Sequence, residues 1–150
     1  AQRIWHESPL RSDCEVWHPS YPQKELFKKS GGQEPMKTAS GRAGEEHIAQ
    51  WLVDHGYEMV ARNYHSRYGE IDLIAQKAPY LCFIEVKTRE ENSLVSPFEA
   101  ISPTKQRKIF LTALEFLQKH PIDLQPRFDA AAVILHRGKI VGEQYLENVF

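Results

Sequence analysis

Two short stretches of this chain decide its fold: Gly-Glu-Ile-Asp-Leu-Ile at residues 69–74 and Phe-Ile-Glu-Val-Lys-Thr-Arg at residues 83–89. Both are apolar runs typical of buried strands, yet each carries charge where a buried strand should have none. Asp72 lies on the first run, and Glu85 and Lys87 lie on the second. Because side chains alternate along a strand, Glu85 and Lys87 point to the same side, with Cα atoms roughly 6.5 Å apart. Two acids and a lysine on paired strands indicate a divalent-metal site that attacks phosphodiesters.

The spacing of the two acids supports this interpretation. Asp72 precedes Glu85 by 13 residues, which suits neighbouring antiparallel strands joined by a short turn. Carboxylates held side by side repel each other unless a cation lies between them, and Mg²⁺ is a hard, oxygen-seeking cation that satisfies this need. Lys87 would then position or deprotonate the attacking water. The alternative is a Glu85–Lys87 ion pair at the end of a strand, which would contribute almost nothing to stability.

Two further acids are candidates for the same site. Glu45 lies near the start of a helix predicted at residues 41–55, where the helix dipole alone favours an acid. Ser40 is the expected N-cap of this helix and Gly56 its C-terminal stop. Glu70 shares a strand side with Asp72, so it is a metal ligand, a neighbour of the ligands or a solvated residue.

The rest of the chain alternates helix and strand signals. Strands are expected at residues 57–64, 68–76, 80–88, 127–135 and 139–146, with a turn at Ala78-Pro79 and a polar loop at residues 90–101. Ser102-Pro103 is typical of a helix start, and this second helix should end before Pro121. The order of helix, three strands, helix, strand and strand predicts an α/β fold around one mixed sheet.

Composition sets broad limits on the function. The 150 residues suffice for one domain with a real core. Lys plus Arg number 19 against 20 Asp plus Glu, a balance that does not by itself indicate a nucleic-acid binder. Cys14 and Cys82 have no metal-pair spacing, and Cys82 is expected to be a small buried hydrophobe. Without an apolar run long enough to span a bilayer or a signal peptide's apolar segment, we expect a cytoplasmic protein with no membrane partner.

Residues 1–37 differ in character from the rest of the chain. They contain four prolines, a Gly31-Gly32 pair and aromatic residues without a clear period. This composition predicts an N-terminal extension, partly ordered or disordered, followed by a compact domain at residues 38–150.

Several short motifs occur in order at compatible spacings. They are Gly41-x-x-Gly44-Glu45, Ala61-Arg62-Asn63, Gly69-Glu70-Ile71-Asp72-Leu73-Ile74, Phe83-Ile84-Glu85-Val86-Lys87-Thr88-Arg89, Ser96-Pro97, Glu99-Ala100, Lys105-Gln106, Arg127-Phe128-Asp129 and Asn148-Val149-Phe150. Together they resemble the YraN-like family of bacterial proteins, usually described as endonucleases of unestablished role. Asp72 with Glu85-Val86-Lys87 is similar to the bipartite motif of the wider PD-(D/E)XK, restriction-endonuclease-like superfamily.

The resemblance implies a particular core and a particular site. The core would be the restriction-endonuclease-like αβββαβ arrangement, with a central mixed sheet flanked by helices. Asp72 and Glu85 would hold Mg²⁺ or Mn²⁺, and Lys87 would be the catalytic lysine. Glu45 matches an additional acid seen in Holliday-junction-resolvase-like members, and Gln106 matches a helix glutamine that some exonuclease-like relatives use near the site.

Basic residues close in sequence to the site are candidate phosphate contacts, which position a substrate without reading its bases. With Gln106, the predicted nucleic-acid-binding set is Arg62, Arg67, Arg89, Lys105, Arg107 and Lys108. The alternative for the charges of the second helix is an ordinary solvated face.

Two functions of different classes follow from these observations. The first is a divalent-metal-dependent endonuclease that hydrolyses DNA and selects branched or single-stranded structure, with RNA left open as a substrate. The second is a catalytically inactive nucleic-acid-binding or protein-interaction module on a nuclease scaffold, recruited by a DNA-processing partner. A plain structural domain with strand-end ion pairs is the third interpretation. A homodimer would suit a two-fold symmetric substrate such as a DNA junction.

Overall fold

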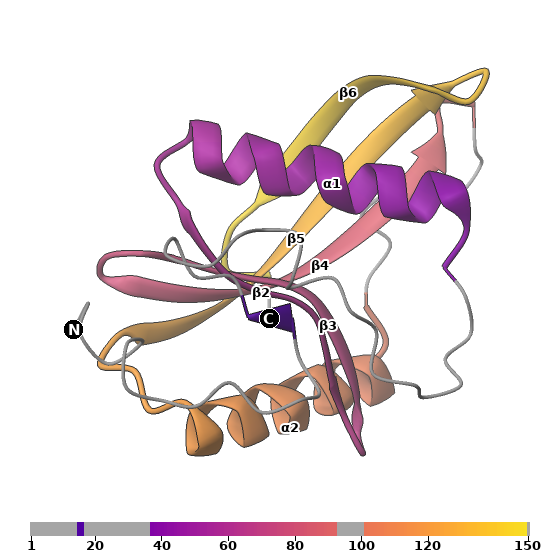
Figure 1. Ribbon diagram of the computed structural model, residues 1–150. Helices are drawn as coiled ribbons and strands as arrows, with labels where there is room; N and C mark the ends of the chain where they lie inside the picture. Colours follow the sequence, from indigo (N-terminus) through magenta and orange to yellow (C-terminus); the bar gives the residue numbers. More distant parts are fainter. Residues whose placement is uncertain (1–14, 17–36, 93–100, 150) are drawn as a thin grey trace.

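Two helices cover opposite faces of one mixed β-sheet (Figure 1). The structure, a computed structural model, describes residues 15–16, 37–92 and 101–149. The elements in chain order are β1 (Glu15–Val16), α1 (Ala39–Asp54), β2 (Glu58–Ser66), β3 (Gly69–Lys77), β4 (Tyr80–Glu90), α2 (Pro103–Lys119), β5 (Gln125–His136) and β6 (Lys139–Leu146). The expected α/β class is confirmed, and so is the expected order of elements from α1 to β6, whereas β1 was not predicted. Cys14, Ser96-Pro97, Glu99-Ala100 and most of the predicted extension lie outside the described residues.

The sheet follows the order of the chain, β1-β2-β3-β4-β5-β6. Strands β2, β3 and β4 form an antiparallel meander, in which β3 and β4 are the predicted antiparallel pair, whereas β4 and β5 run parallel. Parallel neighbours need a crossover connection, and α2 lies in this one. The two-residue strand β1, which belongs to the predicted extension, pairs with β2 at the edge of the sheet.

Strand alternation divides the core into two layers. On one side of the sheet, Cys82 and Ile84 pack in a cluster with Ile48 and Leu52 of α1. On the other side, Leu81 and Phe83 pack in a cluster that includes Ile109 and Phe116 of α2. The alternation expected along β4 is therefore confirmed. Cys82 is a buried free thiol, as expected, and burial raises its pKa to about 12.

The start of α1 corrects one sequence expectation. Thr38, not Ser40, is the N-cap: its side-chain oxygen accepts a hydrogen bond from the backbone N–H of Gly41 at 3.1 Å. Ser40 lies inside the first turn of the helix, which begins at Ala39. Both residue types are good N-caps, so residue type alone does not choose between two candidates that stand two residues apart.

The other predicted helix ends agree with the structure. Gly56, with φ of +85°, follows the C-cap of α1 and adopts the left-handed conformation that favours glycine. Ser102 caps α2 by accepting a hydrogen bond from Lys105 N at 3.2 Å, and Pro103 is the first helical residue. Helix α2 ends at Lys119, before Pro121.

A buried charge network ties β5 to the end of the chain. Asp129 is 0% exposed and accepts hydrogen bonds from Arg127 Nε and Nη2, from Tyr145 Oη at 2.6 Å and from Asn148 N at 2.9 Å. Arg127 Nη2 also donates to Tyr57 Oη at 2.9 Å. The Arg127-Phe128-Asp129 motif is thus explained by packing and hydrogen bonding within the fold.

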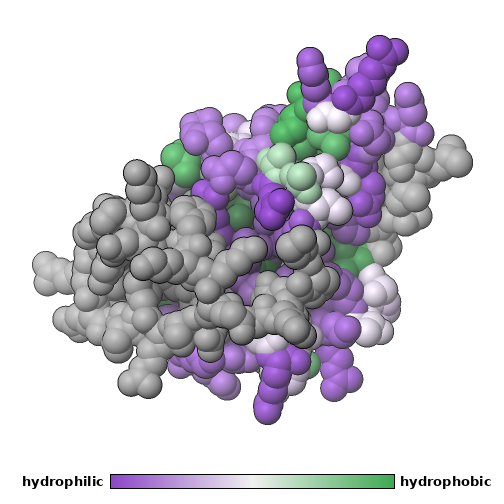
Figure 2. All heavy atoms as spheres, turned by 45° about the vertical axis from the view of Figure 1, so that its right-hand side comes forward, coloured by the Kyte–Doolittle hydropathy of each residue, from purple (hydrophilic) through white to green (hydrophobic). Residues whose placement is uncertain are grey.

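The described part of the surface has no large continuous apolar patch on the face shown in Figure 2. In Figure 2 the described part of the visible face is mainly hydrophilic, with apolar residues in small separate groups. Among the described residues, the large exposed apolar side chains are Val53, Tyr80, Phe110, Leu114, Val141 and Leu146. Such scattered residues are ordinary on a protein surface. Within the described ranges, neither helix is long and apolar enough to cross a membrane.

Candidate active site

The register of β3 and β4 brings the two predicted acids together. Leu73 pairs with Ile84, so Asp72 and Glu85, the next residues on the two antiparallel strands, stand opposite each other. Asp72 is 5% exposed, and its Oδ2 accepts a hydrogen bond from the backbone N–H of Val86 at 2.8 Å. The backbone pairing of β3 with β4 ends at Leu73 and Ile84. Just beyond this point, the hydrogen bond from Val86 N–H to the Asp72 carboxylate holds Asp72 against β4.

Glu45 approaches from α1 because this helix packs very close to β4. Gly44 is buried, and a Cβ atom built on it would lie 2.1 Å from Thr88 Oγ1. Only a residue without a side chain allows this approach. The next residue, Glu45, is 9% exposed, and its carboxylate shares the Lys37 ammonium with Asp72 of β3. The Gly44-Glu45 pair of the first motif thus has a direct physical reason.

We expect Gly44→Ala to lower the free energy of unfolding by about 1–3 kcal/mol, the usual cost of overpacking a close contact. In a Thr88→Ala background the sign should reverse, since the obstructing hydroxyl is gone and alanine favours a helix interior over glycine by about 1 kcal/mol. Urea denaturation of the wild type, the two single variants and the double variant measures this cycle. The same cost of Gly44→Ala in both backgrounds would contradict the close contact.

A lysine that sequence reasoning did not include lies at the centre of the site. Lys37, two residues before α1, places its ammonium within 4 Å of three acids. It forms an ion pair with Glu45, lies 2.7 Å from Asp72 Oδ1 and lies 3.8 Å from Glu70 Oε1. Composition placed Lys37 in the predicted extension, but its side chain belongs to the site of the compact domain.

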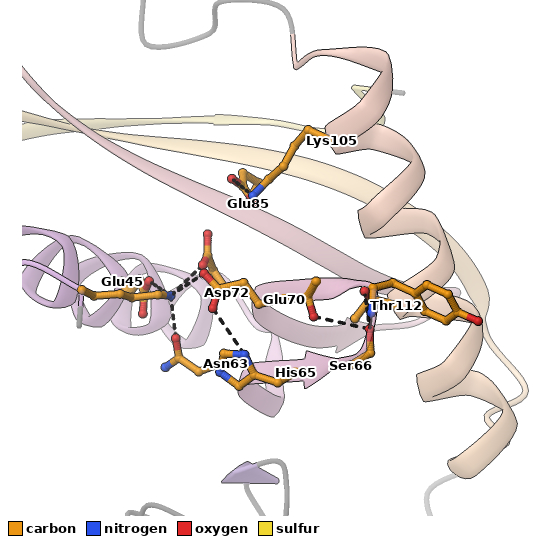
Figure 3. A network of polar contacts seen from close by, with 12 residues as sticks. Glu45, Asn63, His65, Ser66, Glu70, Asp72, Glu85, Lys105 and Thr112 are labelled. Carbon is orange, nitrogen blue, oxygen red and sulfur yellow. Dashed lines mark hydrogen bonds and ion pairs between the residues drawn. The ribbon is translucent and has the colours of Figure 1, made fainter. Parts of the chain in front are cut away.

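Asn63 is the second site residue that sequence reasoning did not assign. It lies on β2 between the pairs Arg62↔Leu73 and Tyr64↔Ile71, which places it opposite Asp72. Its Oδ1 accepts a hydrogen bond from Lys37 Nζ at 2.6 Å, and its φ of +50° lies in the left-handed region that asparagine tolerates better than most residues. Figure 3 shows Glu45, Asn63 and Asp72 converging from α1, β2 and β3. The one available signal was the Ala61-Arg62-Asn63 motif.

Glu85 faces a different lysine. Its Oε1 lies 3.4 Å from Lys105 Nζ, which projects from the first turns of α2 (Figure 3). Lys87, half-buried on the same strand, lies close enough that its charge also lowers the pKa of Glu85. Glu45, Glu70 and Asp72 therefore surround the Lys37 ammonium, whereas Glu85 lies beside Lys105 and Lys87 and interacts with Asp72 through its charge.

Burial and mutual repulsion shift the titration of two of the acids. Burial first, and then the negative charge of Asp72, raise the pKa of Glu85 to about 7, although Lys105 and Lys87 oppose the shift. Burial and Asp72 likewise raise the pKa of Glu45 to about 7 against the effect of Lys37. Burial lowers the pKa of Lys37, but Asp72 and Glu45 outweigh it and raise the pKa above the ordinary value. The site concentrates negative charge and stabilises cations.

The raised pKa of Glu85 predicts a pH effect on stability in the absence of metal. The folded-state value of about 7 exceeds the ordinary 4.5, so the folded protein keeps a proton that the unfolded chain releases between these values. Glu85 therefore favours the folded state less and less as the pH rises from 4.5 to 7. In EDTA at pH 8, Glu85→Gln should exceed the wild type in unfolding free energy by about 1–3 kcal/mol.

Urea denaturation at pH 4.5 and pH 8 tests this effect, and the gain from Glu85→Gln should be much smaller at the lower pH. Glu90→Gln is the matched control, because Glu90 lies on the same strand but is exposed. Equal effects of Glu85→Gln at both pH values would show that burial does not disfavour the charged carboxylate.

The oxygen atoms of the site are of the kind that a divalent cation needs. Over the described ranges, no three Asp, Glu, His or Cys side chains form a group that could hold a metal ion. However, Glu45 and Asp72 already share a positive charge, the Lys37 ammonium. Mg²⁺ is usually bound by one or two protein carboxylates, with waters and phosphate oxygens completing its shell. The residues present therefore fit such an ion, with Asp72 and Glu45 as the carboxylates that converge and Glu85 opposite Asp72.

The predicted nucleic-acid-binding residues are spread over β2, β4 and α2. Arg107 and Lys108 are exposed on α2, and Arg67 is exposed at the turn between β2 and β3. Arg62 forms an ion pair with Glu46 of α1. These four positions leave charged groups at or near the surface, and their contact with nucleic acid stays a prediction.

Three members of the predicted set have contacts within the fold. Arg89 Nη1 donates to Thr88 O at 3.0 Å, and Lys105 faces Glu85. Gln106 Nε2 donates to the backbone oxygen of Ile101 at 2.9 Å. The Gln106 side chain therefore forms a hydrogen bond with the backbone of the residue before the N-cap of α2.

The fold and site together define an α/β protein with buried carboxylates on adjacent strands, an additional acid on a helix and lysines beside them. Sequence comparison assigns this chain to a family: residues 44–133 match the Uncharacterised protein family UPF0102, and the chain belongs to it. The family-level resemblance inferred from the motifs is therefore confirmed, and the matched segment includes Glu45, Asp72, Glu85 and Lys87.

Several UPF0102 proteins are similar to this chain over most of their own length. The chain is 44% identical over 95 residues to a UPF0102 protein of Prosthecochloris aestuarii (strain DSM 271 / SK 413), an alignment that covers 63% of this chain and 75% of the relative. A UPF0102 protein of Rhodococcus jostii (strain RHA1) is 40% identical over 113 residues, covering 75% of this chain and 96% of the relative. A UPF0102 protein of Alkaliphilus metalliredigens (strain QYMF) is 37% identical over 116 residues, covering 77% and 100%.

Proposed function

We propose that this protein is a divalent-metal-dependent endonuclease that hydrolyses phosphodiester bonds in DNA. The observation that carries the proposal is the placement of Asp72 opposite Glu85, with Glu45 bound to the same lysine as Asp72 and Lys87 beside Glu85. Paired carboxylates with a nearby lysine are suited to metal-assisted attack on a phosphate. The order of the elements around these residues also resembles the PD-(D/E)XK, restriction-endonuclease-like core.

Each site residue has a chemical role in this proposal. A bound Mg²⁺ or Mn²⁺ would polarise the scissile phosphate and lower the pKa of a water molecule. Asp72 and Glu45 would hold the ion, and Glu85 would join them or orient the water between itself and Asp72. Lys87 would position or deprotonate the attacking water and offset the negative charge of the transition state. Glu70, farther from the centre of the site, would add to its negative potential.

The basic residues define the expected substrate contacts. Arg67, Arg107 and Lys108 are exposed, and exposed cations of this kind bind phosphates without distinguishing bases. We therefore expect selectivity for nucleic-acid structure, such as branches or single strands, over selectivity for sequence. Binding should weaken as salt is added, because each phosphate contact releases counterions.

One observation favours a second candidate, an inactive nucleic-acid-binding or protein-interaction module on the same scaffold. Every acid of the site has a basic partner: Glu45 and Asp72 with Lys37, Glu70 with His65 and Glu85 with Lys105. The net charge of −1 also suits recruitment by a DNA-processing partner better than unaided binding to a phosphate backbone. Such a module would bind nucleic acid or protein without cutting.

A panel of labelled substrates separates the two candidates. Duplex, single-stranded, flap and four-way-junction DNA, with matched RNAs, would be incubated with the protein in Mg²⁺, Mn²⁺ or EDTA. We expect metal-dependent cleavage of at least one DNA that is absent in EDTA and in the Asp72→Ala variant. Binding without cleavage across the panel with Mn²⁺ present would overturn the nuclease proposal in favour of the module.

A further inference from the structure

The ammonium of Lys37 is held as a ligand is held. A lysine ammonium has three N–H donors, and this one has three hydrogen-bonded oxygen partners: Glu45 Oε1, Asn63 Oδ1 at 2.6 Å and Asp72 Oδ1 at 2.7 Å. These partners come from α1, β2 and β3. All three donors point into the site, so the side chain fills it instead of lying along its surface.

The oxygens around Lys37 are those that a hard divalent cation prefers. Two are carboxylate oxygens and one is an amide oxygen, both typical ligands of Mg²⁺ and related ions. A third acid, Glu70, lies 3.8 Å from the ammonium, and Glu85 stands opposite Asp72. One ammonium charge therefore balances only part of the local negative charge, and a doubly charged ion would balance more of it.

Lys37 can leave the site without disrupting the fold. Its backbone lies before the N-cap Thr38, outside α1, and a lysine side chain is a flexible four-carbon stem with a single charged end. The side chain is 24% exposed, so part of it already contacts solvent. Rotation about its side-chain bonds moves the ammonium out while Glu45, Asn63 and Asp72 stay on their helix and strands.

We propose that Lys37 is a tethered competitor of the metal: its ammonium occupies the position of the divalent cation and must leave before the ion binds to Glu45, Asp72 and the amide oxygen of Asn63. The inference rests on the metal requirement of the proposed nuclease. The apparent metal affinity is then the intrinsic affinity reduced by the fraction of molecules in which Lys37 has left. Lys37 thus keeps the acidic site intact without metal and sets the metal concentration at which the protein becomes loaded.

Calorimetric titration with MnCl₂ or MgCl₂ tests the competition directly. Lys37→Met keeps the length and apolar stem of the side chain but removes the ammonium. We expect it to bind the ion roughly tenfold more tightly than the wild type, the ratio for a lysine that occupies the site in about nine molecules in ten. Lys139→Met is the matched control, because Lys139 is exposed at the start of β6, and it should bind like the wild type.

A second measurement uses the unaltered protein. Limited acetylation by acetic anhydride, followed by mass spectrometry, reports how accessible each lysine amine is. Without metal, Lys37 should be protected by its three hydrogen bonds. Saturating Mg²⁺ should increase its acetylation several-fold and leave Lys139 unchanged. Calorimetric binding of Mg²⁺ with Lys37 still protected would overturn the competition.

The outcomes distinguish this inference from the proposed nuclease activity. Wild-type affinity in Lys37→Met, with metal-dependent cleavage intact, would overturn the competition and leave the nuclease standing. Tighter metal binding in Lys37→Met without cleavage of any substrate would support the competition and reject the nuclease. Failure of both proteins to bind either metal ion would overturn the competition together with the metal requirement.

Discussion

Lys87→Met is expected to lower the rate of metal-dependent DNA cleavage by at least about a hundredfold, the lower end of the effect of removing a positioned acid–base group. Lys87 lies two residues after Glu85 on β4, and its charge reaches that carboxylate. In the proposed mechanism its amine positions or deprotonates the water and offsets charge in the transition state. Methionine keeps the stem of the side chain and removes both contributions, so the loss should fall on the chemical step.

Single-turnover cleavage of the best substrate from the panel measures this effect. Metal affinity by calorimetry should change little, because Lys87 is not among the residues that converge on the Lys37 ammonium. Near-UV circular dichroism would verify the fold, and Lys139→Met controls for the loss of one positive charge. A variant that cleaves at the wild-type rate would remove Lys87 from the mechanism.

Asp129→Ala should lower the free energy of unfolding by about 3–5 kcal/mol, the usual result of removing one partner of a buried ion pair. The carboxylate is completely buried and accepts hydrogen bonds from Arg127, Tyr145 and the backbone of Asn148. Without it, the guanidinium of Arg127 and the hydroxyl of Tyr145 keep their desolvation cost and lose their acceptor. The contacts of Asp129 with β5 and those with the C-terminal residues would be lost together.

Urea denaturation at pH 7 tests the prediction, with Asp123→Ala as the control. Asp123 is exposed in the segment between α2 and β5, so its removal should change stability by less than about 0.5 kcal/mol. A similarly small effect of Asp129→Ala would mean that water replaces the lost acceptor. The network and the candidate active site involve different residues, so the fraction of Asp129→Ala that stays folded should keep its metal affinity.

Local signals in the sequence predicted most of the secondary structure correctly. The apolar run around residues 83–86 indicated a buried strand, which the structure shows packed on both faces, and the Ser102-Pro103 pair indicated the start of α2. These signals depend on the geometry of a few adjacent residues. The prediction of the N-cap of α1 was wrong, because Thr38 and Ser40 are both suitable cap residues and stand only two residues apart.

The candidate site was predictable only in part. Asp72, Glu85 and Lys87 could be grouped because they lie on two strands joined by a short turn, which makes their contact nearly local. Glu45 needed the family resemblance, because an acid close to the start of the predicted helix is favoured for other reasons. In the structure α1 begins at Ala39 and its first turn contains no acid, so the helix dipole does not explain Glu45. The structure explains its position through the close approach of α1 to β4 at Gly44.

By itself, the sequence determined the α/β class, the order of the elements and the two charged strands at the centre of the protein. Tertiary structure alone decided that Lys37 reaches Asp72, 35 residues away, and Asn63, 26 residues away, and that Lys105 of α2 faces Glu85. The physical reason is the range of the interactions. Helix and strand periodicity follows from the backbone geometry of neighbouring residues, whereas a shared ammonium depends on how one helix and two strands pack after the whole chain has folded.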